Sequence, residues 1–189
     1  MRLAVFAGSS TGRRAAYRRG AEALGQALAA RQIELVYGGA QLGLMGVVAD
    51  ACLAAGGRVI GVLPETLDRI EIGHRGLTEL HIVTTMHERK ALMADLSEGF
   101  IALPGGLGSL EELFEVWTWT QLGIHRKPLG LLNVEGFYDS LVAFVDQQVE
   151  EAFVKPEHRG ILASAADPDV LIDAMQAAEL PEVPKWIDP

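Results

Sequence analysis

The chain has 189 residues, which is enough for one domain with a full hydrophobic core. Hydrophobic residues make up 49% of it and charged residues 22%, a globular composition that excludes long disordered regions. The formal net charge of −9 opposes nonspecific attraction to nucleic acid or to an anionic membrane. Any anionic ligand is therefore expected to be held by a local site, and neither nucleic acid nor a membrane is an expected partner.

Cysteine and histidine usage limits the chemistry further. Cys52 is the only cysteine, so an internal disulfide is excluded and a reducing, cytoplasmic setting is expected. We expect this thiol to be a small buried hydrophobe rather than a nucleophile. The five histidines lack His-x-x-x-His spacing, so no metal site is expected. The first residues do not resemble a secretory leader, and no apolar run reaches the roughly 18 residues of a membrane span.

Short apolar runs alternate with helical periodicity along the whole chain. The expected strands cover residues 3–6, 34–37, 58–63, 80–83, 100–103 and 129–132, with 160–163 as a candidate seventh. The expected helices cover 17–28, 44–55, 86–96, 110–122, 138–151 and 168–178. This alternation predicts an α/β fold, with an open parallel sheet covered by helices on both faces. We expect one domain over residues 1–180, followed by a mobile tail over 181–189.

A glycine-rich loop follows the strand expected at 100–103. Gly105, Gly106 and Gly108 allow close approach to the backbone, while the next helix supplies free N–H groups and the positive end of its dipole. Ser109 adds a hydroxyl group. These features predict a phosphate site, although a tight turn with Ser109 as helix N-cap accounts for the same residues. The loop is not a Walker motif, because neither Lys-Ser nor Lys-Thr follows it.

Two more glycine-containing loops occupy the same position after a strand. Gly8 and Ser9 follow the first expected strand, and Gly38 and Gly39 follow the second. Each loop taken separately is compatible with a tight turn. Because open parallel sheets bind ligands beyond the carboxyl ends of their strands, the three loops together predict one nucleotide-type site.

Arg89 and Lys90 lie near the start of the helix expected at 86–96. The helix dipole disfavours cations there unless an anion binds nearby, so this pair also indicates an anionic ligand. The alternative is a solvated basic pair that Glu88 balances.

Glu111 and Glu112 are expected in the first turn of the helix after Ser109. Carboxylates in that place can simply stabilise the helix dipole. Neighbouring residues on a helix point about 100° apart, so only one of the two is expected to face a ligand. A carboxylate beside a sugar can stabilise an oxocarbenium-like transition state or orient water, as cleavage of a glycosidic bond requires.

The segments 86–90 and 104–112, Met-His-Glu-Arg-Lys and Pro-Gly-Gly-Leu-Gly-Ser-Leu-Glu-Glu, together resemble the signature of the Lonely Guy family. These are cytokinin riboside 5′-monophosphate phosphoribohydrolases, which older descriptions called lysine decarboxylases. The resemblance covers nearly the whole chain except its tail, including the loops at residues 7–10, 37–39 and 43–46. It implies a Rossmann-like homodimer that hydrolyses the N-glycosidic bond of adenosine-type 5′-monophosphates without a metal or redox cofactor.

The resemblance also assigns roles to individual residues. Arg89 and Glu112 would form the catalytic pair. The residues expected to bind the phosphate and ribose are Lys90, Gly105, Gly106, Gly108 and Ser109. Met86 and Glu71 would lie closer to the base, and the loops that carry Gly8, Ser9 and Gly39 would complete the binding site.

Three positions depart from the family pattern. Ala40 replaces a common third glycine, Ser109 replaces threonine, and Thr84 stands where aspartate is frequent. These departures leave open whether plain AMP or an N6-isoprenylated nucleotide is preferred. A non-catalytic nucleotide or cofactor carrier remains the main alternative, because a fold does not fix a function. A lysine decarboxylase is not expected, since nothing in the sequence marks a pyridoxal Schiff-base lysine.

A homodimer is also expected from the residues themselves. The helix that carries Trp117 and Trp119, together with Leu122–Ile124, offers more apolar surface than one sheet face needs. The two tryptophans are expected in the core or in a subunit contact.

Overall fold

A computed structural model describes residues 1–68 and 73–180 of the chain. Its seven strands form one sheet in the order β4-β3-β2-β1-β5-β6-β7, and every pairing between neighbours is parallel. The strands are β1 (Arg2–Phe6), β2 (Glu34–Tyr37), β3 (Val59–Pro64), β4 (Glu79–Val83), β5 (Gly99–Ala102), β6 (Leu129–Leu132) and β7 (Leu162–Ala165). The helices are α1 (Ala15–Ala30), α2 (Gly43–Ala54), α3 (Glu65–Asp68), α4 (Met86–Leu96), α5 (Leu107–Gln121), η1 (Val134–Gly136), α6 (Asp139–Glu150), α7 (Pro156–Arg159) and α8 (Pro168–Ala177).

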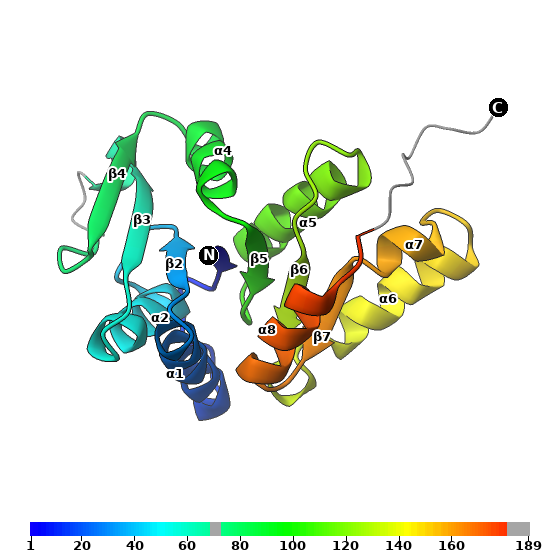
Figure 1. Cartoon of the computed structure of the whole chain (residues 1–189), viewed down its shortest axis with the longest axis horizontal. Coiled ribbons are helices and arrows are strands. Elements are labelled where there is room, and N and C mark those ends of the chain that lie inside the picture. Colours follow the sequence, from blue (N-terminus) through cyan, green and yellow to red (C-terminus); the bar gives the residue numbers. More distant parts are fainter. Residues whose placement is uncertain (69–72, 181–189) are drawn as a thin grey trace.

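Helices cover both faces of the sheet (Figure 1). Successive residues of a strand point to opposite faces, so Leu3 and Val5 enter one core while Ala4 and Phe6 enter the other. The first core is closed by α1, α2 and α8, and the second by α4, α5 and α6. Both faces of the strands are therefore buried, which explains their continuous apolar runs. The predicted Rossmann-like α/β fold is confirmed.

Some predicted boundaries were wrong. The helix expected from Leu110 begins three residues earlier, at Leu107. The seventh strand covers Leu162–Ala165 instead of 160–163, because α7 occupies the residues just before it. The short helices α3 and α7 were not predicted, since four residues are too few for a helical period to show. The predicted tail at 181–189 lies outside the described residues.

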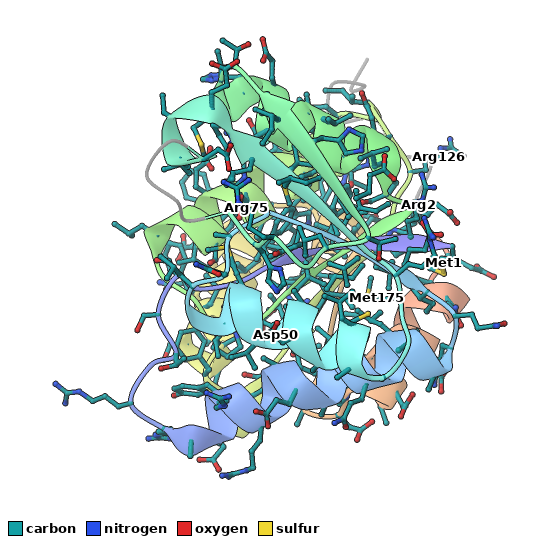
Figure 2. The ribbon with its side chains drawn as sticks, turned by 90° about the vertical axis from the view of Figure 1, so that its left-hand side faces the viewer. Met1, Arg2, Asp50, Arg75, Arg126 and Met175 are labelled. Carbon is teal, nitrogen blue, oxygen red and sulfur yellow. The ribbon has the colours of Figure 1, made fainter. Side chains whose placement is uncertain are left out.

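The strand order places β1 between β2 and β5, which is where the order reverses direction. The loops after β1 and β5 then leave toward opposite faces and open a crevice at the carboxyl ends of these strands. Met1, Arg2 and Arg126, labelled in Figure 2, mark the other end of the sheet, where β1 and β6 begin. In the described part of the chain, no helix has the length and apolarity needed to cross a bilayer.

Candidate functional site

A hollow of about 260 Å³ lies at the carboxyl ends of β1 and β5. It is lined by Ala7, Ser9, Met45, Met86, Arg89, Gly106, Leu107, Gly108, Ser109, Glu111 and Glu112. A second hollow of about 210 Å³ shares Ser9 and Gly106 and extends toward Tyr17 and Phe137. The loops after β1 and β5 therefore meet in one crevice, whereas neither glycine of the third predicted loop, Gly38 and Gly39, lines either hollow.

Arg89 enters this crevice from α4. The start of α4 is held by a capping box, in which Thr85 and Glu88 each accept a hydrogen bond from the other's backbone N–H. Arg89 lies one residue further along and is buried. Its Nε donates to the backbone carbonyl of Val62 on β3 at 3.3 Å. Its Nη1 lies 3.2 Å from Oε1 of Glu112, so the side chain joins α4, β3 and α5.

Glu112 is the buried carboxylate of the site. Burial raises its pKa, and the positive charge of Arg89 opposes part of that shift. A carboxylate with a raised pKa can stay ionised at neutral pH and still accept a proton readily. Buried titratable groups with a specific charged partner, located in a cleft, are typical of functional sites.

The start of α5 has the features of an anion site. Gly106 is its N-cap and has no side chain, so no N-cap side chain accepts a hydrogen bond from the first N–H groups of the helix. A Cβ atom at Gly106 or Gly108 would meet no described atom within 4 Å, whereas at Gly105 it would lie 2.2 Å from Oγ of Ser109. Packing therefore explains Gly105. Gly106 and Gly108 instead face open space, where a ligand can reach the backbone.

The interpretation of Ser109 as helix N-cap was wrong, because it is the third residue of α5. For the same reason Glu111 and Glu112 fall in the second turn of the helix rather than the first. Neither carboxylate is placed to cap α5. The dipole explanation for this pair therefore does not hold.

Lys90 points toward α5. Its Nζ forms an ion pair with Glu111 and another with Glu115, the latter at 3.0 Å. The helix-dipole conflict that indicated an anion beside Arg89 and Lys90 is thus relieved by carboxylates of α5. The alternative, in which Glu88 balances the pair, is also wrong, because the Glu88 carboxylate accepts the backbone N–H groups before α4.

The remaining predicted residues take different positions. Gly8 joins the loops, since its N–H donates to Pro104 at 3.3 Å and its carbonyl accepts from Leu44 at 2.9 Å. Met86 lines the larger hollow. Gly39 does not line either hollow and packs against Leu63, with a φ of +74° that favours glycine. Glu71 lies outside the described residues.

The residues at the site that the sequence analysis missed include Met45 and Gly38. Met45 lines the hollow from α2, and no feature of its type distinguished it from a core residue. Gly38 lies against the guanidinium group of Arg89, so a Cβ atom there would lie 1.8 Å from Nη2. The sequence showed a glycine pair at 38–39 but not which of the two glycines approaches the site.

Two of the positions that depart from the family pattern, Ala40 and Thr84, have side chains that do not line the hollow. Ala40 is buried and pairs with Gly73 in an isolated antiparallel bridge. The backbone N–H of Thr84 donates to Oε2 of Glu88 at 2.8 Å, which adds to the cap of α4. Neither side chain lines the hollow that contains Arg89 and Glu112.

Fold and site together define a Rossmann-like α/β protein with a candidate ligand crevice at the reversal point of its sheet. Two solved structures share this fold: the molybdenum cofactor carrier protein of Chlamydomonas reinhardtii, at a TM-score of 0.69, and the molybdenum cofactor binding protein of Rippkaea orientalis, at 0.70. Each is 21% identical in sequence, and each comparison covers 93% of this chain and 95% of the other. At this identity the likeness concerns the fold alone.

Sequence relatives define the family. The profile described as "Possible lysine decarboxylase" matches residues 45–175. A probable cytokinin riboside 5′-monophosphate phosphoribohydrolase of Oryza sativa subsp. japonica is 53% identical over 175 residues, which cover 93% of this chain and 77% of the relative. A cytokinin riboside 5′-monophosphate phosphoribohydrolase of Arabidopsis thaliana is 51% identical over 175 residues, which cover 93% and 82%. The chain belongs to this family, the Lonely Guy family.

Proposed function

We propose that the protein is a phosphoribohydrolase that cleaves the N-glycosidic bond of an adenosine-type nucleoside 5′-monophosphate. Its products are the free base and ribose 5-phosphate. The observation that carries this proposal is the buried pair of Arg89 and Glu112 beside an open, glycine-lined helix start. The names of the relatives that are 51–53% identical support the substrate class.

We propose one orientation of the substrate in the crevice. We place the 5′-phosphate at the start of α5, where Gly106, Gly108 and Ser109 line the hollow and the helix dipole favours an anion. The ribose then lies beside Glu112. The base extends toward Met45 and Met86, whose flexible thioether side chains can adapt to an N6-isoprenyl group as well as to plain adenine.

In the proposed reaction, the bond between C1′ and the base nitrogen breaks and its electron pair leaves with the base. Positive charge develops at the sugar, and the ionised carboxylate of Glu112 stabilises it. The oxygen of a water molecule bonds to C1′ and gives one proton to Glu112. The base nitrogen takes up a proton from solvent water as the base departs, and Glu112 later returns its proton to solvent, so atoms and charge balance. Arg89 keeps Glu112 ionised and oriented, and contacts the substrate.

The lysine chemistry suggested by the older family description is not supported at Lys90. Burial lowers the pKa of this amine, but hydrogen bonds to Glu111 and Glu115 outweigh burial and raise the pKa. A Schiff-base lysine must reach its neutral form, which these two carboxylates oppose.

We further propose a homodimer in the cytoplasm. Trp117 is buried and its Nε1 donates to the carbonyl of His158 at 2.9 Å, so it belongs to the core. The surface offered to a second subunit is instead the end of α5 and the turn after it, where Leu122 and Ile124 are exposed. The buried thiol of Cys52 suits a reducing compartment.

The direct test incubates the purified protein separately with AMP, N6-isopentenyl-AMP and adenosine, and assays the free base and ribose 5-phosphate. We expect release from both nucleotides and little from adenosine. Calorimetry on the same samples measures binding. Tight nucleotide binding without any product would overturn the proposal and favour the carrier function.

A further inference from the structure

Gly38 and the guanidinium group of Arg89 occupy adjoining space. Gly38 directly follows β2, whereas Arg89 extends from α4. A Cβ atom on residue 38 would lie 1.8 Å from Nη2, 2.9 Å from Cζ and 3.3 Å from Nε of Arg89. Nη2 and Cζ are therefore too close for any side chain at this position, and Nε lies at a tight contact distance. Arg89 can hold its present position only if residue 38 is glycine.

The backbone conformation does not by itself demand glycine there. Gly39 has a φ of +74°, in the region that disfavours other residues, but Gly38 is not among the glycines with positive φ. An alanine at residue 38 would thus fit the backbone, and the three atoms nearest to its Cβ would all belong to Arg89. The requirement for glycine is one of space.

Arg89 cannot move aside without loss. Its Nε hydrogen bond to Val62 and its Nη1 contact with Glu112 fix the guanidinium plane from two sides, and Gly38 bounds it on a third. The side chain of Arg89 is only 10% exposed. A methyl group at residue 38 would push Nη2 outward and turn the planar group, so that both contacts could not be kept.

We propose that Gly38 is a positioning residue that sets Arg89 against Glu112 for the glycosidic cleavage. The inference rests on the proposed function for its catalytic consequence. The contact itself rests on the geometry alone. Gly38 acts through Arg89, and it is this buried approach, rather than the flexibility of the loop, that requires glycine.

Moving Arg89 also changes the electrostatic surroundings of Glu112. The charged groups that act on this carboxylate are Arg89 and Lys90 from α4, and Glu111 and Glu115 from its own helix. Arg89 is the strongest of the four and favours the ionised form of Glu112. Displacing its guanidinium group leaves the raised pKa of Glu112 higher still. The acid limb of the rate profile is then expected to move to higher pH.

A double-mutant cycle tests the contact without any activity measurement. Thermal unfolding is compared for the wild type, Gly38→Ala, Arg89→Ala and the double variant. We expect Gly38→Ala to lower Tm in the wild-type background and to leave it unchanged or higher in the Arg89→Ala background, where the methyl group finds space. An equal fall in both backgrounds, or failure of the double variant to fold, would overturn the inference.

Turnover then tests the catalytic consequence. We expect Gly38→Ala to reduce kcat at neutral pH at least about tenfold, with an acid limb at higher pH. The matched control is Gly160→Ala, where the added Cβ would lie 3.4 Å from its nearest neighbour, an ordinary contact, and activity should be retained. Wild-type kcat and pH profile in Gly38→Ala would refute the positioning role. An inactive wild type would instead refute the proposed function, while the unfolding cycle still reports the contact.

Discussion

Nη1 of Arg89 lies 3.2 Å from Oε1 of Glu112, and the side chain of each residue is only 10% exposed. The two come from α4 and α5, which precede and follow β5 in the chain and cover the same face of the sheet, and they meet beyond its carboxyl end. Away from bulk water their attraction is stronger than on a protein surface, and a hydrogen bond from Nε to the carbonyl of Val62 also holds Arg89. A charge pair held in this way needs little rearrangement when charge develops on a bound sugar.

Glu112→Gln is expected to retain nucleotide binding and to lose most turnover. The amide has nearly the same shape, but it can neither stabilise a cationic sugar nor accept a proton from water. We expect kcat to fall by about two to four powers of ten. Calorimetry measures the binding of AMP, and an assay of ribose 5-phosphate measures turnover.

Glu111→Gln provides the comparison at the next residue. The side chain of Glu111 is 57% exposed and turned toward Lys90, which keeps its second partner, Glu115. We expect most of the turnover to remain. The opposite result, with Glu111→Gln inactive and Glu112→Gln active, would show that the catalytic carboxylate is the neighbouring one.

The pH dependence follows from the direction of the Glu112 shift. Burial raises the pKa of this carboxylate above that of an ordinary glutamate, and the reaction needs the ionised form. Activity should therefore be full at pH values above the raised pKa and fall as the pH drops through it. The acid limb of kcat/KM should lie at higher pH than an exposed glutamate would give. Residual turnover in Glu112→Gln should lack this limb.

A substrate that lacks the 5′-phosphate should have a much lower kcat/KM value. The start of α5 offers helix N–H groups and an open glycine backbone, and charge-assisted hydrogen bonds of this kind contribute about 1.5–3 kcal/mol each. The kcat/KM value for adenosine is thus expected to be at least about tenfold below that for AMP. Equal values would mean that the helix start does not bind phosphate.

A single charged substitution should disturb the proposed dimer. Ile124 is 65% exposed and follows α5 in the turn that carries Leu122. Burying a carboxylate in an apolar interface is costly, so Ile124→Glu should shift the mass toward the monomer. Light scattering at micromolar concentration compares the two proteins. A monomeric wild type would contradict the dimer itself.

The thiol of Cys52 should be inert in the folded protein. It is fully buried, and burial raises its pKa to about 11. Because the thiolate is the reactive form, a disulfide reagent at pH 8 should modify Cys52 only after unfolding. Rapid labelling of the native protein would show that the region around α2 opens readily.

Much of this architecture could be predicted from the sequence because its signals are local. Buried parallel strands read as short apolar runs, and helices as periodic stripes, so their alternation determined the fold class. The glycine loop after β5 and the Arg-Lys pair of α4 likewise identified the two segments that form the crevice. Their position beyond strand ends followed from the rule for open parallel sheets.

The tertiary structure decided what these residues contact. Where α5 begins depends on how the chain leaves β5, and this made Gly106 the N-cap and moved Ser109 inside the helix. The packing of α4 against α5 turned Lys90 toward carboxylates and left Arg89 with Glu112. Pairs of this kind depend on the distance between elements remote in sequence, which no local pattern contains. The same reason explains why only the folded chain shows that Gly38 makes room for Arg89.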